Sequence, residues 1–69
     1  MCQMSVVYEE NGERRTVMEN VTYLEVSGDG VRVTTLFAEP QVVAASFVKT
    51  IDFMGGVVTL APVGEGKNG

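Results

Sequence analysis

The stretch VTYLEVSGDGVRVTTLF, residues 21–37, decides the fold class of this chain. It consists of two runs rich in β-branched residues, 21–27 and 31–37, on either side of the turn sequence Gly28-Asp29-Gly30. In each run apolar and polar side chains alternate. This pattern is typical of a strand, because successive side chains of a strand lie on opposite faces of the sheet. Two such runs joined by a short glycine-containing turn predict a β-hairpin.

The chain before this stretch predicts a second hairpin. Residues 2–10 alternate and are followed by Asn11-Gly12, a strong signal for a two-residue hairpin turn, and by a returning strand at 13–18. One face of the first of these strands carries Cys2, Met4, Val6 and Tyr8. Glu19-Asn20 is expected to be a turn, so that 13–18 and 21–27 are separate strands.

The segment 38–46 follows a less regular pattern. Pro40 has no N–H to donate to a strand ladder, so this segment is expected to be a loop or an edge strand. Residues 41–44 are compatible with a short strand, whereas a single helical turn that begins at Ala44 fits as well. The sequence leaves both structures open for residues 41–46.

The C-terminal part predicts a third hairpin. Residues 47–53 alternate, Gly55-Gly56 supplies a turn, and 57–61 form the returning strand, which Pro62 ends. The remaining residues, 63–69, are polar and rich in glycine, so we expect them to form a flexible tail.

The spacing of these elements indicates the fold class. Five or six short antiparallel strands within about sixty residues are typical of a small barrel or sandwich. We therefore expect an all-β protein with one domain over residues 1–62 and an SH3-like barrel as its architecture. Aromatic and methionine side chains are expected to fill the core; the alternatives are a peptide groove for the aromatic ones and thioether ligation for the methionines. These residues are Met4, Tyr8, Met18, Tyr23, Phe37, Phe47, Phe53 and Met54.

Composition argues against several classes of function. The five basic and nine acidic residues give a net charge of −4 and form no basic patch, which argues against nucleic-acid binding. The chain has no histidine to serve as a general base beside a nucleophile, so no enzyme is expected. Neither a secretory signal nor a membrane-spanning segment is recognisable, and we expect a cytoplasmic protein with a reduced thiol.

Cys2 is the single cysteine, and the residues around it leave two interpretations open. It is either a small buried hydrophobic residue or a metal ligand. If Met1 is removed, the α-amine and the thiolate of Cys2 form a five-membered chelate ring, to which the backbone nitrogen of Gln3 adds a second. If Met1 is retained, Cys2 binds through its thiolate and its own backbone nitrogen. Planar nitrogen and thiolate donors suit Ni(II), and a twofold axis would let two Cys2 residues share one ion.

The chain also resembles a known family in a series of short segments. In order along the chain these are Met1-Cys2, Val7-Tyr8, Val17-Met18-Glu19-Asn20-Val21, Gly28-Asp29-Gly30-Val31, Leu36-Phe37-Ala38-Glu39 and Val48-Lys49-Thr50-Ile51-Asp52-Phe53. Together, over residues 1–61, they resemble the CooT family of small nickel-binding proteins. Ala38 and Pro40 depart from the family pattern, which has glycine at the first of these positions, so we expect the loop after Phe37 to differ.

The resemblance implies an SH3-like homodimer that binds Ni(II) through the cysteine after the initiator methionine, which is Cys2 here. It also implies that the protein delivers nickel to carbon monoxide dehydrogenase. Our main hypothesis is therefore a cytoplasmic nickel chaperone or store, with Cys2 and Gln3 as the metal-binding residues. The alternatives are a metal-free protein-interaction module and a small RNA-binding barrel.

Overall fold

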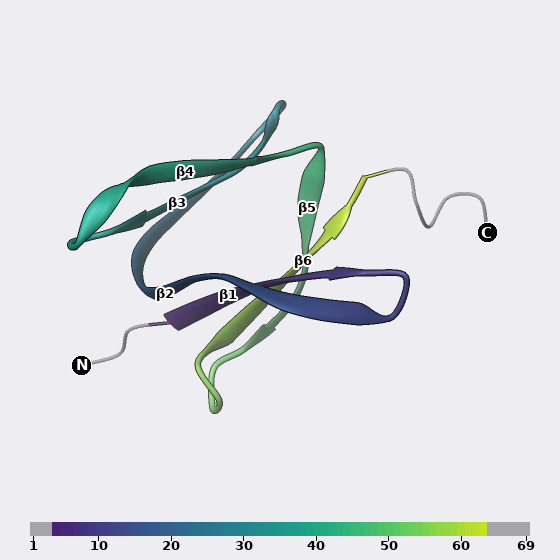
Figure 1. Cartoon of the computed structure of the whole chain (residues 1–69), viewed down its shortest axis with the longest axis horizontal. Helices are drawn as coiled ribbons and strands as arrows, with labels where there is room; N and C mark the ends of the chain where they lie inside the picture. The colour runs from purple at the N-terminus through teal and green to yellow at the C-terminus, as the bar shows by residue number, and fades with distance from the viewer. Residues whose placement is uncertain (1–3, 64–69) are drawn as a thin grey trace.

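The computed structural model describes residues 4–63, which form one mixed β-sheet (Figure 1). The strands are β1 (Met4–Glu10), β2 (Glu13–Ser27), β3 (Gly30–Thr35), β4 (Ala38–Ala44), β5 (Ser46–Asp52) and β6 (Val57–Pro62). Their order in the sheet is β4-β3-β2-β1-β6-β5. Residues 4–63 contain no helix, which confirms the all-β class. The expectation of purely antiparallel pairing is wrong, because β1 runs parallel to β6.

β2 is one long strand rather than the two strands that the sequence predicted. Its first half pairs with β1 and its second half with β3, and Val21 pairs with both neighbours. The expected turn at Glu19-Asn20 is instead a bend within the strand, where Asn20 has a φ of 60°. Asparagine tolerates this left-handed conformation better than most residues. Asn20 therefore does mark a change in backbone direction, but within one strand rather than between two.

The segment after Phe37 forms the edge strand β4, with Pro40 inside it. Proline is tolerated there because an edge strand pairs on one side only. The helical turn considered for residues 41–46 is absent, since Ala44 ends β4 and Ser46 begins β5. Ala38 lies in the strand and is not among the residues with positive φ, so this position does not require glycine.

A corner made by Val43–Ser46 joins the two edge strands of the sheet. Ala45, the one residue between β4 and β5, has a φ of 52°. Its N–H donates to the carbonyl of Asp29 (3.0 Å), and its carbonyl accepts from the N–H of Val63 (2.8 Å). The hydroxyl of Ser46 donates to the carbonyl of Val43 (2.7 Å). The corner is therefore hydrogen-bonded to the β2–β3 turn and to the residue that follows β6.

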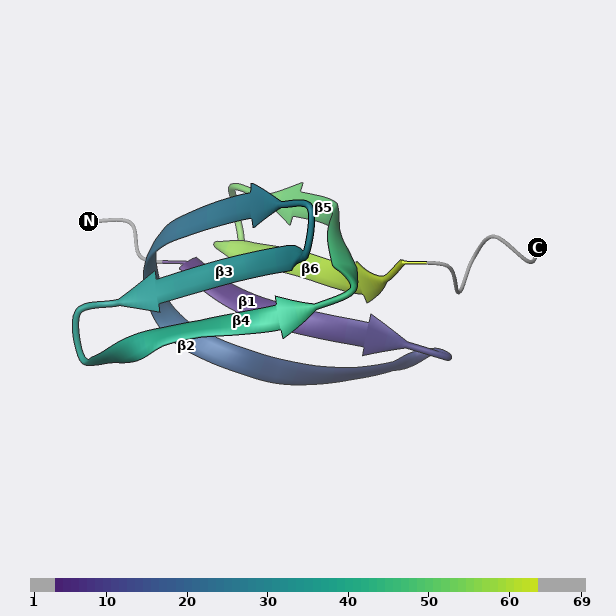
Figure 2. The ribbon, with the colours of Figure 1, turned by 90° about the horizontal axis from the view of Figure 1, so that it is seen from above.

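The corner makes the sheet curl without closing it. β4 and β5 are at opposite ends of the strand order, yet one residue joins them, so the two edges approach each other at the corner (Figures 1 and 2). Beyond it they leave in different directions and do not pair with each other (Figure 1). The expected closed barrel is therefore not formed, and the structure is a curled open sheet.

The core is aliphatic and lies on the inner face of the curled sheet. Its buried side chains are Val6, Val21, Val31, Val33, Val58 and Leu60. Met4, Tyr8 and Met18 pack against this cluster, as predicted. The same prediction is wrong for the other aromatic residues and for Met54, which are exposed. Phe37, Phe53 and Met54 lie in turns rather than in strands, which explains why they do not face the core.

Gly30 provides a test of the corner. Its φ is 149°, and an added Cβ would collide with the Val43 carbonyl oxygen and lie 2.9 Å from Cα of Ala44. Gly30→Ala should therefore lower the free energy of unfolding by about 2 kcal/mol or more, measured by urea denaturation. Gly28→Ala is the matched control: an added Cβ there meets nothing within 4 Å, so a change of no more than about 0.5 kcal/mol is expected. Equal losses in the two variants would contradict the tight corner.

Candidate functional site

The predicted metal-binding residues, Cys2 and Gln3, lie outside the described residues, so the structure does not place them. They directly precede Met4, where the described part of β1 begins. Met4 pairs with Val21 of β2, which in turn pairs with Thr35 at the end of β3. On the other side of β1, the Ser5 N–H donates to the carbonyl of Gly56 (2.8 Å). The described part of β1 therefore starts in the middle of the sheet, with neighbours on both sides.

Two turns with exposed apolar side chains are at this end of the sheet. The β3–β4 turn carries Leu36 and Phe37, which are 78% and 74% exposed, and directly follows Thr35. The β5–β6 turn carries Phe53 and Met54, which are 81% and 98% exposed. Single exposed apolar residues are common on protein surfaces, but adjacent pairs of large ones indicate a contact surface.

The β5–β6 turn is held in place by the residue before it. The Asp52 carboxylate accepts a hydrogen bond from the N–H of Gly55 (2.9 Å), and the Asp52 carbonyl accepts one from the N–H of Gly56 (2.8 Å). Since Gly56 also accepts from Ser5, the turn is connected to the start of β1 through the backbone. Phe53 and Met54 are thus presented from an anchored turn.

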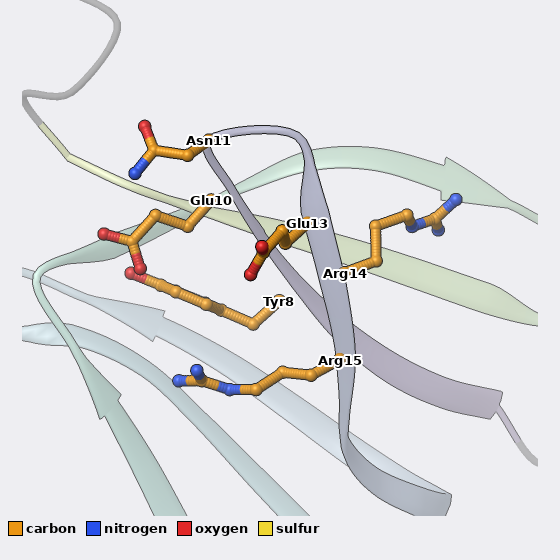
Figure 3. A pocket seen from close by; sticks show the side chains of 6 residues that line it. All are labelled: Tyr8, Glu10, Asn11, Glu13, Arg14 and Arg15. Atoms are coloured by element: carbon orange, nitrogen blue, oxygen red, sulfur yellow. The ribbon is translucent and has the colours of Figure 1, made fainter.

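The β1–β2 hairpin, at another part of the molecule, forms a pocket of about 300 Å³ (Figure 3). The Asn11-Gly12 turn at its tip has φ values of 55° and 83°, which confirms the predicted hairpin turn. The guanidinium of Arg15 lies 5.0 Å from the centre of the Tyr8 ring. Arg14 points away from Arg15, to the other side of the strand (Figure 3). The pocket combines an aromatic ring with side chains of both charges.

The outer face of the sheet uses its charged residues in structural contacts. Arg14 donates to the hydroxyl of the buried Thr59 (3.2 Å), which lies on β6. Glu9 and Lys49 form an ion pair at 3.4 Å between β1 and β5. Exposed pairs of this kind contribute little to stability. These contacts account for three of the charged side chains near the hairpin without any catalytic role.

The described residues offer no alternative metal site. Within residues 4–63, no three His, Cys, Asp or Glu residues gather in a group that could hold an ion. No buried side-chain nitrogen or oxygen in this part of the chain lacks a hydrogen-bond partner. No helix in the described range is long and apolar enough to cross a membrane. The metal-binding role of Cys2 stays a prediction from the sequence.

Comparison with known proteins assigns this chain to a protein family. Residues 1–61 match the family model of a carbon monoxide dehydrogenase accessory protein, an accessory rather than a catalytic class. The chain belongs to this family, CooT, as its sequence segments had indicated. No curated protein matches the chain significantly.

A solved structure agrees with the fold. The crystal structure of a CooT candidate from Carboxydothermus hydrogenoformans superimposes with a TM-score of 0.79 and 16% sequence identity. The match covers 88% of this chain and 97% of that chain. At this level of identity the likeness concerns the fold, and it shows that the curled open sheet is shared.

Sequence reasoning missed the two apolar turns. Leu36-Phe37 was assigned to the end of a strand, and Met54 was assigned to the core. The available signal was the position of Phe53 and Met54 directly before Gly55-Gly56, which places both residues in the turn rather than in the preceding strand. Apolar residues in a turn cannot share the inner face of the sheet and are exposed.

Asp52 tests how the β5–β6 turn is held. Asp52→Ala removes the acceptor for the Gly55 N–H and should lower the free energy of unfolding by about 1 kcal/mol. Hydrogen exchange of the Gly55 amide should become faster at the same time. Asp52→Asn keeps an acceptor oxygen and should retain slow exchange. If both variants exchanged like the parent, the side chain of Asp52 would not hold the turn.

Proposed function

We propose that this protein binds Ni(II) through Cys2 and acts as a nickel chaperone or store in the maturation of carbon monoxide dehydrogenase. The observation that carries the proposal is the combination of family membership with one cysteine, placed directly before the strand that occupies the middle of the sheet. The absence of a competing donor cluster in residues 4–63 supports it further. A cytoplasmic location completes the proposal, since the single thiol would stay reduced there.

The proposed donors are the thiolate of Cys2 and nearby nitrogens. With Met1 removed, the α-amine of Cys2 and the backbone nitrogen of Gln3 complete two five-membered rings with the metal. With Met1 retained, the backbone nitrogen of Cys2 takes the place of the amine. Every donor must lose a proton before it binds, so the affinity for nickel should rise with pH.

A homodimer would supply the second thiolate. One cysteine per chain cannot fill a coordination square with sulfur, whereas a twofold axis near Cys2 brings two thiolates to one ion. The β5–β6 turn supports this arrangement, since Phe53 and Met54 are exposed apolar residues and the backbone of their turn is bonded to Ser5. Burial of these side chains against a second copy would also stabilise a domain with a small core.

Cys2→Ala tests the metal site. Nickel affinity measured by calorimetry should fall roughly 100-fold or more, since loss of even a supporting residue of a metal site costs 10- to 100-fold. The circular dichroism spectrum should stay unchanged, because the substitution changes none of the six buried side chains of the core. A variant that binds nickel like the parent would refute the proposal that Cys2 is the ligand, whereas a parent that binds no nickel would favour the metal-free interaction module.

Gln3 allows the nitrogen donors to be tested in the same way. Gln3→Pro removes the backbone N–H that must ionise and should weaken nickel binding, whereas Gln3→Ala keeps that N–H and should bind like the parent. Native mass spectrometry of the parent gives the number of subunits and of nickel ions and shows whether Met1 is present. Salt-sensitive binding of RNA without nickel would instead favour the RNA-binding alternative.

The dimer proposal is tested at the β5–β6 turn. The double variant Phe53→Ser, Met54→Ser should sediment as a monomer at concentrations at which the parent is a dimer, because the buried apolar contact is lost. Phe47→Ser is the control. It also removes an exposed phenylalanine, but one near the start of β5, at the end of that strand away from the β5–β6 turn. Sedimentation of the parent as a monomer with nickel bound would contradict the dimer.

A further inference from the structure

We propose that the tip of the β3–β4 hairpin, Leu36-Phe37, is the surface that docks onto the enzyme that accepts the metal. The partner surface it fits is an apolar socket bordered by lysine or arginine. This inference rests on the proposed function for the identity of the partner, but Leu36 and Phe37 are different residues from the proposed metal ligands and from the proposed dimer contact.

The exposure of the tip is the first argument. Leu36 and Phe37 are adjacent, large and more than 70% exposed, in contrast to the six buried aliphatic residues of the core. The exposed apolar surface continues onto the sheet. Tyr23 pairs with Thr34, two residues before Leu36, and is itself 58% exposed. Side chains that bind tightly at interfaces are typically aromatic and become fully buried there.

The tip is also held in a defined conformation. Thr35, directly before it, is buried and pairs with both Val21 and Ala38. The N–H of Phe37 donates to the hydroxyl of Thr35 in a long hydrogen bond of 3.4 Å. On the other side, the ring of Pro40 restricts the backbone of β4. An ordered tip loses little conformational entropy on binding, which favours a docking role.

The charge of the tip indicates the chemistry of the partner. Residues 34–42 carry one charged side chain, the carboxylate of Glu39, two residues after Phe37. Glu39 is exposed, and residues 34–42 contain no cation that could neutralise it. A basic group beside the partner's apolar socket would therefore complement the charge of this tip.

A second copy of the chain fits this tip less well. In a twofold contact the same patch meets itself, which would bring Glu39 close to the Glu39 of the other copy. The C-terminal tail is no better candidate, because Val63 is bonded to Ala45, beyond the far end of β4 from the tip. The proposed dimer contact at Phe53-Met54 is on the opposite side of the start of β1.

The experiment measures binding of the nickel-loaded protein to immobilised, nickel-free carbon monoxide dehydrogenase from the same organism by surface plasmon resonance. The double variant Leu36→Ser, Phe37→Ser should bind about 30-fold more weakly, the loss expected for an aromatic anchor. Glu39→Lys should also bind more weakly, most clearly at low salt, and Glu39→Gln should be intermediate. Phe47→Ser, which removes an exposed aromatic residue elsewhere, should bind like the parent.

Three outcomes would overturn the inference. Binding of the double variant like the parent would show that the tip is not the docking surface. Sedimentation of the double variant as a monomer, while the parent is a dimer, would assign the tip to a second copy. Loss of nickel binding in the double variant would assign the tip to the metal site. The Cys2→Ala experiment tests the proposed function separately. If Cys2 is needed for nickel binding but the double variant docks like the parent, the docking inference fails and the proposed function stands.

Discussion

The left-handed backbone of Ala45 is the constraint on which the rest of the structure depends. Since one residue joins β4 to β5, the first and last strands of the sheet order must come together at this point. The six strands then have to curl around a common core. Left-handed backbone is costly for alanine, and the hydrogen bonds to Asp29 and Val63 offset this cost. The core valines are buried because the corner brings the two halves of the sheet together.

The corner also separates the molecule into two ends of different character. The corner end is built from backbone hydrogen bonds and from Gly30, where a Cβ has no room. The other end includes the start of β1 and the turns that expose Leu36, Phe37, Phe53 and Met54. The closest backbone packing is thus at one end, while the surfaces proposed for dimer formation and enzyme docking are at the other.

Much of this fold could be predicted from the sequence, and the errors have physical reasons. Alternation located most of the strands, and Asn11-Gly12 predicted the first turn correctly, because these signals are local. The bend at Asn20 was read as a turn, since local sequence does not show that Val21 pairs with two strands at once. The parallel pairing of β1 with β6 depends on residues about fifty positions apart, which local patterns cannot reveal. Cys2 drew attention as the single cysteine, and its role stays a prediction. The apolar turns were missed because residues such as Phe37 continue a strand pattern beyond the end of the strand.

The parallel pair of β1 and β6 has a consequence for the order in which the protein is made. β1 is synthesised before β6 but needs it as one of its two neighbours, so one edge of β1 stays unpaired until β6 has been made. Unpaired edges of this kind invite wrong partners, and the pairing that protects this edge joins residues about fifty positions apart. The strand that directly follows Cys2 and Gln3 in the sequence therefore completes its pairing only after β6 has been made.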